Sequence, residues 1–174
     1  NKKWYFGANA GLDFMTNPPT VVTGAMTSPE GCSAISDGAG NLLFYTNGIN
    51  ACNANHSAMP APGAMLGHPS ACQSGVIVKQ PGNNNIYFVF SNSANFGGGT
   101  IGLRYSIVDM SLAAGLGSIT AINIPLVTPT TEQVTSVKHA NGIDVWVLTR
   151  LYNVSTYHAY LVTAAGVNTV PVVS

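Results

Sequence analysis

One pattern occurs three times in this chain and limits what it can fold into: an apolar segment, a turn rich in glycine or asparagine, and a second apolar segment. The first copy is GCSAISDGAGNLLFYTNG, from Gly31 to Gly48. The second copy runs from Gln73 to Phe90 and the third from Thr135 to Thr149. Glycine and asparagine tolerate the backbone angles of tight turns, and the flanking segments are apolar. The sequence therefore predicts three β-hairpins.

Further segments of strand composition follow each hairpin and precede the first. Alternation of apolar and polar residues and enrichment in aromatic and β-branched types favour strands rather than helices. Helical periodicity is absent from the sequence as a whole. The additional strands are expected at 3–14, at Val21-Val22, from Ile49 onward, at 103–109, at 119–126, at 157–162 and at 170–173. The stretch 59–69, with three prolines and two glycines, is expected to be an irregular connection.

The hairpins recur at a spacing that indicates an internal repeat. Their second strands start near Asn41, Asn85 and Asp144, which are 44 and 59 residues apart. Four short strands in about 40–50 residues are the signature of a β-propeller blade. The predicted fold is all-β, a partial β-propeller of about three to four four-stranded antiparallel blades. The blade-like repeats lie at about 30–66, 73–127 and 133–174, and a β-sandwich is the alternative.

The number of repeats is small for a closed propeller, which typically has 4–8 blades. We therefore expect 1–174 to be a single propeller-like region and a fragment of a longer chain. The alternative is that a neighbouring subunit covers its open edges. The remainder of its own chain and neighbouring subunits are thus the first expected partners.

The composition excludes several classes of protein. Only 7% of the 174 residues are charged, and six basic residues balance six acidic ones. Nucleic acids and anionic membrane surfaces are bound by clustered lysine and arginine, so neither is an expected partner. No apolar run approaches the roughly 20 residues that span a bilayer. Asn, Ser, Thr and Gly are abundant, which is common in secreted β-proteins. The opening segment NKKWYFG lacks the apolar core of a signal peptide, so an exported chain would be in its mature form.

Three cysteines are too few for a disulfide framework. Cys52 and Cys72 flank the Pro- and Gly-rich connection, so a disulfide between them is one expectation and two free thiols the other. Cys32 alternates with Ala34 on a predicted strand, and a buried, unreactive thiol is expected there.

Several blocks of the sequence resemble one known family. These are GCSAISDGAGNLLFYTNG, NHSAMP, QSGVIVKQPGNNNIYFVF, YSIVDMSLAAGLG and TPTTEQVTSVKHANGIDVWVLT, in this order over nearly the whole chain. The chain resembles the N-terminal propeller-like region of large secreted Bacteroidetes surface proteins, which usually carry a C-terminal sorting domain for type IX secretion. The resemblance implies a propeller-like fold and export to the cell surface or medium, and it implies no catalytic residues. The chain departs from the family at Cys52-Asn53, where the family has a Trp-Asn pair, and it lacks the sorting domain.

Motifs for cofactors and metals are weak. GGGTIG, at 97–102, fits the dinucleotide fingerprint formally, but the strand-like LRYSIVD follows it where that motif requires a helix. His56 and His68 could approach Cys52 or Cys72 across the irregular connection, yet no spacing typical of zinc ligands is present. No cofactor and no metal site is therefore predicted.

The spacing of the six carboxylate residues along the sequence does not identify a catalytic pair. A glycosidase needs two carboxyl groups that face one cleft, which the sequence alone cannot place. Asp37 and Asp144 belong to hairpin turns, where aspartate caps backbone amides. No nucleophile elbow and no phosphate-binding loop is present. No catalytic residue is assigned, and an enzyme is not expected.

These observations lead to a prediction of function. We expect a non-catalytic, secreted or cell-surface structural or binding module, adhesin-like, whose loops contact a protein or a glycan. The candidate surface aromatics are Trp4, Tyr5, Tyr152 and Tyr157. The alternatives are a secreted hydrolase or its accessory domain, and a subunit of an extracellular fibre that assembles through exposed strand edges.

Overall fold

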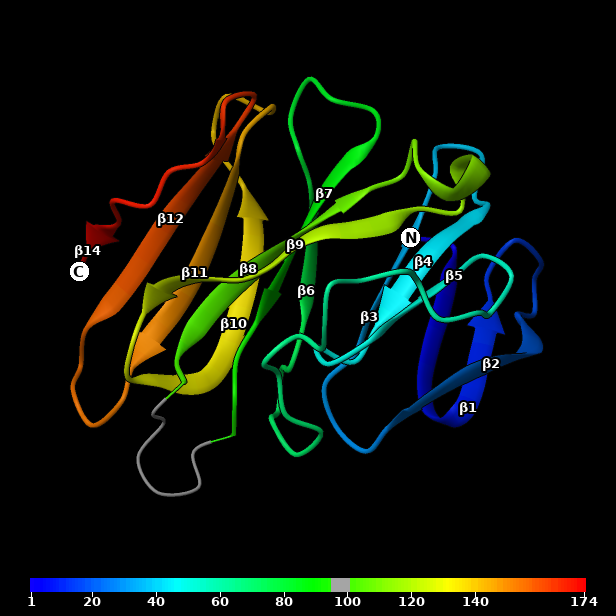
Figure 1. Ribbon diagram of the computed structural model, residues 1–174, viewed down its shortest axis with the longest axis horizontal. Coiled ribbons are helices and arrows are strands. Elements are labelled where there is room, and N and C mark those ends of the chain that lie inside the picture. The colour runs from blue at the N-terminus through cyan, green and yellow to red at the C-terminus, as the bar shows by residue number, and fades with distance from the viewer. Residues whose placement is uncertain (95–100) are drawn as a thin grey trace.

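The computed structural model describes residues 1–94 and 101–174, and it is an all-β protein (Figure 1). Its strands form four small antiparallel sheets, each built from consecutive strands of the chain. A single 3₁₀ turn, η1 at Ala113–Gly115, interrupts the described strands. No helix among the described residues is long and apolar enough to cross a membrane.

The first sheet contains β1 (Lys3–Asp13) and β2 (Thr20–Ser28). β1 folds back on itself near Gly7 and Asn9, which both have positive φ. Consequently Lys3 forms an ion pair with Asp13, and the Phe14 N–H donates to the Lys2 carbonyl over 2.8 Å. The expected strand 3–14 is therefore present but doubled, and the short strand expected at Val21-Val22 is part of a nine-residue strand.

The three predicted hairpins are confirmed, each in its own sheet. The second sheet has the order β3-β4-β5, the third β6-β7-β8-β9, and the fourth β10-β11-β12-β13, with β14 also paired to β12. The strand bounds are β3 Ser33–Ser36, β4 Leu42–Thr46, β5 Ala51–Asn53, β6 Val76–Lys79, β7 Ile86–Ser91, β8 Leu103–Asp109, β9 Ser118–Val127, β10 Thr130–Lys138, β11 Val145–Leu151, β12 Tyr157–Thr163, β13 Gly166–Val167 and β14 Val172–Val173.

The turns between the hairpin strands use side-chain capping, as the sequence predicts. Asp37 accepts hydrogen bonds from the Asn41 backbone N–H at 2.8 Å and from its side-chain amide at 2.9 Å. Asn83 and Asn141 each accept two backbone N–H groups within their own turns, at 2.9–3.2 Å. These bonds replace backbone partners that the tight turn cannot supply.

Successive sheets pack face to face, because several strands bury both of their faces. In β4, Phe44 points into the core between the second and third sheets, whereas Tyr45 points into the core between the first and second. In β7, Val89 belongs to the core between the second and third sheets, and Phe90 belongs to the core between the third and fourth sheets. Three hydrophobic cores thus join four sheets in chain order, with the first and last sheets at opposite ends of the molecule (Figure 1).

The second sheet departs from the predicted repeat. It has three strands where a four-stranded blade was expected, and the irregular connection predicted at 59–69 is confirmed. This connection is still part of the fold, because Met59 and Met65 are buried in the core between the second and third sheets. Methionine side chains are flexible and fill irregular gaps in a hydrophobic core.

Candidate functional site

The first strands of the second, third and fourth sheets lie next to one another: β3 contacts β6, and β6 contacts β10. β3, β6 and β10 are the first strands of their sheets, and the chain segments that lead into them, the entry segments, lie at the same end of the molecule. Buried hydrogen bonds tie the entry segments together, because the Ser74 hydroxyl donates toward the Gly31 carbonyl at 2.6 Å and lies 2.5 Å from the Asn47 carbonyl. Gly48, with φ +81°, packs directly on the Ser74 backbone, where a side chain would not fit.

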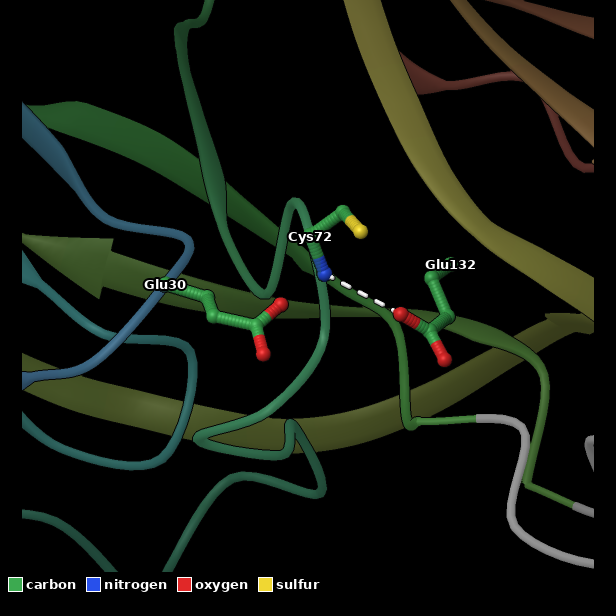
Figure 2. A group of neighbouring side chains, drawn as sticks. All are labelled: Glu30, Cys72 and Glu132. Carbon is green, nitrogen blue, oxygen red and sulfur yellow. Dashed lines mark hydrogen bonds between the residues drawn. The ribbon is translucent and has the colours of Figure 1, made fainter.

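Three side chains from these entry segments converge at this end of the molecule. Glu30 precedes β3, Cys72 precedes β6, and Glu132 is the third residue of β10. One carboxylate oxygen of each glutamate and the Cys72 sulfur all lie within 4.8 Å of one another. Figure 2 shows the two carboxylates on either side of Cys72, with the Cys72 backbone N–H donating to Glu132 Oε2 at 3.2 Å. We call Glu30, Cys72 and Glu132 the entry cluster.

The electrostatics of the entry cluster keep its thiol protonated. The hydrogen bond and charge of Glu132, and more weakly those of Glu30, raise the pKa of Cys72 above its ordinary value. A thiolate is the reactive form of cysteine, so Cys72 is a poor nucleophile at neutral pH. Two carboxylates and a thiol are ligand types that a divalent cation such as zinc accepts, but three groups, two of them on exposed residues, are at the lower limit for such a site.

The entry cluster adjoins a small cavity of about 160 Å³ between β10, β11 and the start of β12. Its surface is mostly apolar, although several of the side chains that line it also carry a polar group; the lining includes Gln73, Gln133, Leu148, Arg150 and Tyr157. Gln73 and Gln133 directly follow Cys72 and Glu132 in the sequence. Tyr152 is also close, since its backbone N–H donates to the carbonyl of Pro129, next to the start of β10, at 3.2 Å. Amides, carboxylates and tyrosines therefore gather at this end of the molecule.

The structure separates the four candidate aromatics. Trp4 and Tyr157 are exposed, with about half of each side chain accessible (52% and 50%), and Tyr152 is half-buried. Tyr5 is buried and stacks on Tyr45 with ring centroids 4.4 Å apart. Tyr5 is therefore a core residue and not a surface-binding aromatic, because it alternates with Trp4 along β1 and faces the second sheet.

The disulfide expected between Cys52 and Cys72 is not formed, and both thiols are free. Cys52 is buried beside Tyr45, and burial raises the pKa of its thiol. Cys72 is exposed in the entry cluster. The Pro- and Gly-rich connection thus leads from the buried Cys52 to the exposed Cys72 of the entry cluster and does not bring the two cysteines together.

His56 and Cys52 both contact the Tyr45 hydroxyl, whereas the entry cluster around Cys72 contains no histidine. His56 Nδ1 lies 3.1 Å from the Tyr45 hydroxyl, which accepts the Ala25 N–H at 2.8 Å. Because the hydroxyl oxygen accepts that N–H, its own proton is available to His56. Burial raises the pKa of Tyr45 to about 12, so this hydroxyl remains protonated and has a structural role. His68 Nδ1 accepts the Ser70 backbone N–H at 3.1 Å.

Most of the GGGTIG motif (97–100) lies outside the described residues. The strand expected after it is present as β8 at Leu103–Asp109, where the dinucleotide fingerprint would require a helix.

The sequence did not identify the entry cluster as a site. Its three residues are far apart along the chain, and a glutamate, a cysteine and a glutamate in two loops and one strand form no known motif. One signal was present: the residues lie at or directly before the starts of the predicted repeats, 30, 73 and 133. If repeats meet at their first strands, residues at equivalent starting positions meet as well.

Comparisons of this chain with protein-family models, with curated proteins and with solved structures found no match.

Proposed function

We propose that this chain is a non-catalytic binding module of a secreted or cell-surface protein, with its four sheets arranged as consecutive blades of a β-propeller. The contacts of β3 with β6 and of β6 with β10 support the propeller over a sandwich. In a propeller the first strands of all blades surround a common axis, whereas a sandwich has two sheets with one core between them. Three cores between four sheets suit the propeller.

The observation that carries the binding function is the convergence of Glu30, Cys72 and Glu132 within 4.8 Å at one end of the first strands. Loop ends of rigid β-scaffolds are where binding residues usually lie. Here carboxylates and the amides of Gln73 and Gln133 can hydrogen-bond hydroxyl groups, and the exposed ring of Tyr157 can stack on an apolar face. A glycan offers both kinds of group, which makes it the ligand we favour over a protein.

A hydrolase is the second candidate, because the carboxylates of Glu30 and Glu132 are close to one another. Glycosidases use two carboxyl groups about 5–9.5 Å apart on either side of a bound sugar. The 160 Å³ cavity beside them is lined by neither glutamate, and one oxygen of each carboxylate lies within 4.8 Å of the other. This arrangement does not hold a glycosidic bond between an acid and a base, so binding without hydrolysis is the better conclusion.

Fibre assembly through strand edges has less support. The outer edge of β12 is paired at both ends, with β13 at Val162 and Thr163 and with β14 at His158 and Ala159. β9, the outer strand of the third sheet, has three register irregularities along β8. Short partner strands and bulges are devices that prevent edge-to-edge pairing.

A glycan array probed with the fluorescently labelled chain tests the proposed function. We expect retention on a subset of glycans, and we expect the Glu30→Gln/Glu132→Gln double variant to bind those glycans at least about tenfold more weakly, because two charged hydrogen bonds are each replaced by a weaker neutral one. A matched control, Asp109→Asn, removes a carboxylate at the end of β8 and should bind like the parent chain. Absence of binding to any glycan, or release of reducing sugar from a bound glycan, would contradict the proposal.

A further inference from the structure

A groove of about 490 Å³ lies between the β6–β7 hairpin and the β10–β11 hairpin, at the end of the molecule opposite the entry cluster (Figure 1). It is lined by the β6–β7 turn, by the last residues of β6 and β10, and by the start of β11. The Gln80 side-chain amide donates to the Ala164 carbonyl at 2.7 Å, which ties the β6–β7 turn to the β12–β13 turn. The groove shares no lining residue with the cavity of about 160 Å³ at the entry end. The two are therefore separate sites on the surface.

The groove carries positive charge and no negative charge. Lys79 and Lys138 both line it, and both are exposed. They are two of the six basic residues of the chain, whereas none of its six acidic residues lines the groove. Neither lysine has an ion-pair partner among the described residues. The carboxylate of Asp144, which adjoins the lining in sequence, accepts the Asn141 side-chain amide at 2.8 Å instead. The two ammonium groups therefore remain without a neutralising carboxylate in the groove.

The uncharged polar groups of the lining are also mainly hydrogen-bond donors. The Asn83 side-chain oxygen accepts two backbone N–H groups, and the Asn84 side-chain oxygen accepts the Lys79 ammonium at 3.1 Å. Each of these amides has its NH2 group left to donate, and Ser136 adds a hydroxyl. Gln80 is the exception, because its amide nitrogen is engaged and its oxygen remains. Carboxylate groups only accept hydrogen bonds, so an anion complements this lining better than a neutral ligand does.

The size and the apolar part of the groove suit a short segment of a sugar chain. Small-molecule sites usually have volumes of about 300–1,000 Å³, and the groove lies within this range. Its lining includes two exposed apolar side chains, Val137 and Ile143 (55% and 68% exposed). A sugar ring offers C–H groups that pack on such side chains and hydroxyl groups that bond to amides. A sugar acid adds the carboxylate that the lysines require.

We propose that this groove binds an acidic sugar residue, whose carboxylate is attracted by Lys79 and Lys138. The preference for an anion follows from the groove alone, whereas the choice of a sugar over an acidic peptide rests on the proposed glycan-binding function. The module then has two sites at opposite ends of its first strands. The entry cluster, with two carboxylates, binds hydroxyl groups, and the groove binds negative charge.

Isothermal titration calorimetry with trigalacturonate and with its fully methyl-esterified form tests the groove. The two probes have the same sugar rings, and only the first is negatively charged. We expect the acid to bind at least about tenfold more tightly than the ester, because charge-assisted hydrogen bonds are stronger than neutral ones. Its affinity should fall when NaCl is raised from about 50 to 500 mM, since salt screens exposed charges. Equal affinities for acid and ester, an affinity that salt leaves unchanged, or no binding of the acid up to about 10 mM would overturn the inference.

A double variant assigns the binding to the two lysines. Lys79→Gln/Lys138→Gln should weaken trigalacturonate binding at least about tenfold, because both charges are removed. Both side chains are exposed, so the variant should keep the thermal midpoint of the parent chain. The matched control Lys2→Gln removes an exposed lysine outside the groove and should bind like the parent. Equal losses in the control and in the double variant would overturn the inference.

Two further measurements separate this inference from the proposed function. Glu30→Gln/Glu132→Gln should leave trigalacturonate binding unchanged, and a loss in this variant equal to that in the lysine variant would overturn the separate groove site. A triglutamate peptide with blocked termini carries the same number of carboxylates and should bind more weakly than trigalacturonate; tighter binding of the peptide would overturn the choice of a sugar. Glutamate-dependent binding of neutral glycans without any binding of trigalacturonate would overturn the inference and leave the proposed function standing.

Discussion

At the scale of single residues, the molecule depends on a few positions that join the entry segments of successive sheets. Gly48 and Ser74 illustrate this, since the glycine packs on the serine backbone and the serine hydroxyl lies between two carbonyls. Most buried polar groups in proteins have hydrogen-bond partners, and the two carbonyls beside the Ser74 hydroxyl define the geometry of this junction. The same junction determines where the side chains of the entry cluster emerge.

The first prediction concerns Gly48. Gly48→Ala should lower the free energy of unfolding by about 3 kcal/mol or more, because the methyl group meets the Ser74 backbone in addition to the cost of positive φ. Gly142→Ala is the matched control, with φ +73° and no atom within 4 Å of the added carbon. The control should cost only about 1 kcal/mol. Equal losses for the two variants in urea unfolding would contradict the close packing at Gly48.

The second prediction concerns the reactivity of Cys72. The neighbouring carboxylates raise the pKa of its thiol, so its alkylation by iodoacetamide at pH 8 should be slow for an exposed cysteine. Glu132→Gln removes the larger cause of the shift and should increase the rate severalfold, because a lower pKa gives more thiolate at this pH. Asp109→Asn serves as the control. An unchanged or slower rate in Glu132→Gln, measured by peptide mass spectrometry, would contradict the geometry of the entry cluster.

At the scale of elements, Tyr45 connects β2, β4 and the segment that follows β5. Its hydroxyl accepts the Ala25 N–H of β2 and contacts His56, while its ring stacks on Tyr5 of β1. Hairpins that are local in sequence are thus joined by a few long-range polar contacts, which position the first sheet against the second.

The third prediction is made for this connection. Tyr45→Phe should reduce the free energy of unfolding by about 1–3 kcal/mol, since it leaves the Ala25 N–H without its acceptor. Tyr152→Phe removes a hydroxyl from a half-buried loop residue and should change stability by less than about 0.5 kcal/mol. Urea unfolding monitored by circular dichroism gives both values. A Tyr45→Phe variant as stable as the parent would show that the hydroxyl does not connect these elements.

The hairpins could be predicted because their determinants are local. Asp37, Asn83 and Asn141 cap turns within a few residues of themselves, and the alternation in β4 and β7 is visible in the sequence. The doubled β1 could not be predicted, since it depends on positive φ at Asn9 and on the pairing of Lys3 with Asp13. The entry cluster was also beyond reach, because it depends on the packing of three sheets. The burial of Tyr5 was missed because alternation alone does not say which face of a strand is covered.

At the scale of the whole molecule, burial of tyrosines gives a pH dependence. Burial raises the pKa of Tyr45 and of Tyr160 to about 12, and raises the pKa of Tyr5, Tyr87 and Tyr105 above the ordinary value. Their contribution to stability is complete below the unfolded pKa of about 10 and is lost as pH rises toward 12, because the unfolded chain ionises first.

The fourth prediction follows from this sign. The thermal midpoint should be nearly constant from pH 7 to 9 and should fall steeply between about pH 10 and 12. Absorbance at 295 nm should show that a part of the seven tyrosines ionises only when the protein unfolds. Tyr45→Phe should make the alkaline loss of stability shallower relative to Tyr152→Phe. Complete ionisation of all tyrosines near pH 10 with the fold intact would contradict the buried cores.

The central claim is that successive sheets meet along their first strands, and one cross-linking measurement tests it directly. The variant Glu30→Cys/Glu132→Cys, with Cys32, Cys52 and Cys72 changed to serine, places two thiols on the second and fourth sheets, which are not neighbours. A bismethanethiosulfonate with a two-carbon spacer should cross-link these thiols within one chain in high yield at low protein concentration. The control pair Ala8→Cys/Ile143→Cys, on the first and last sheets, should not be cross-linked within one chain. Failure of the 30–132 link in a chain that remains folded would contradict the convergence and with it the propeller arrangement.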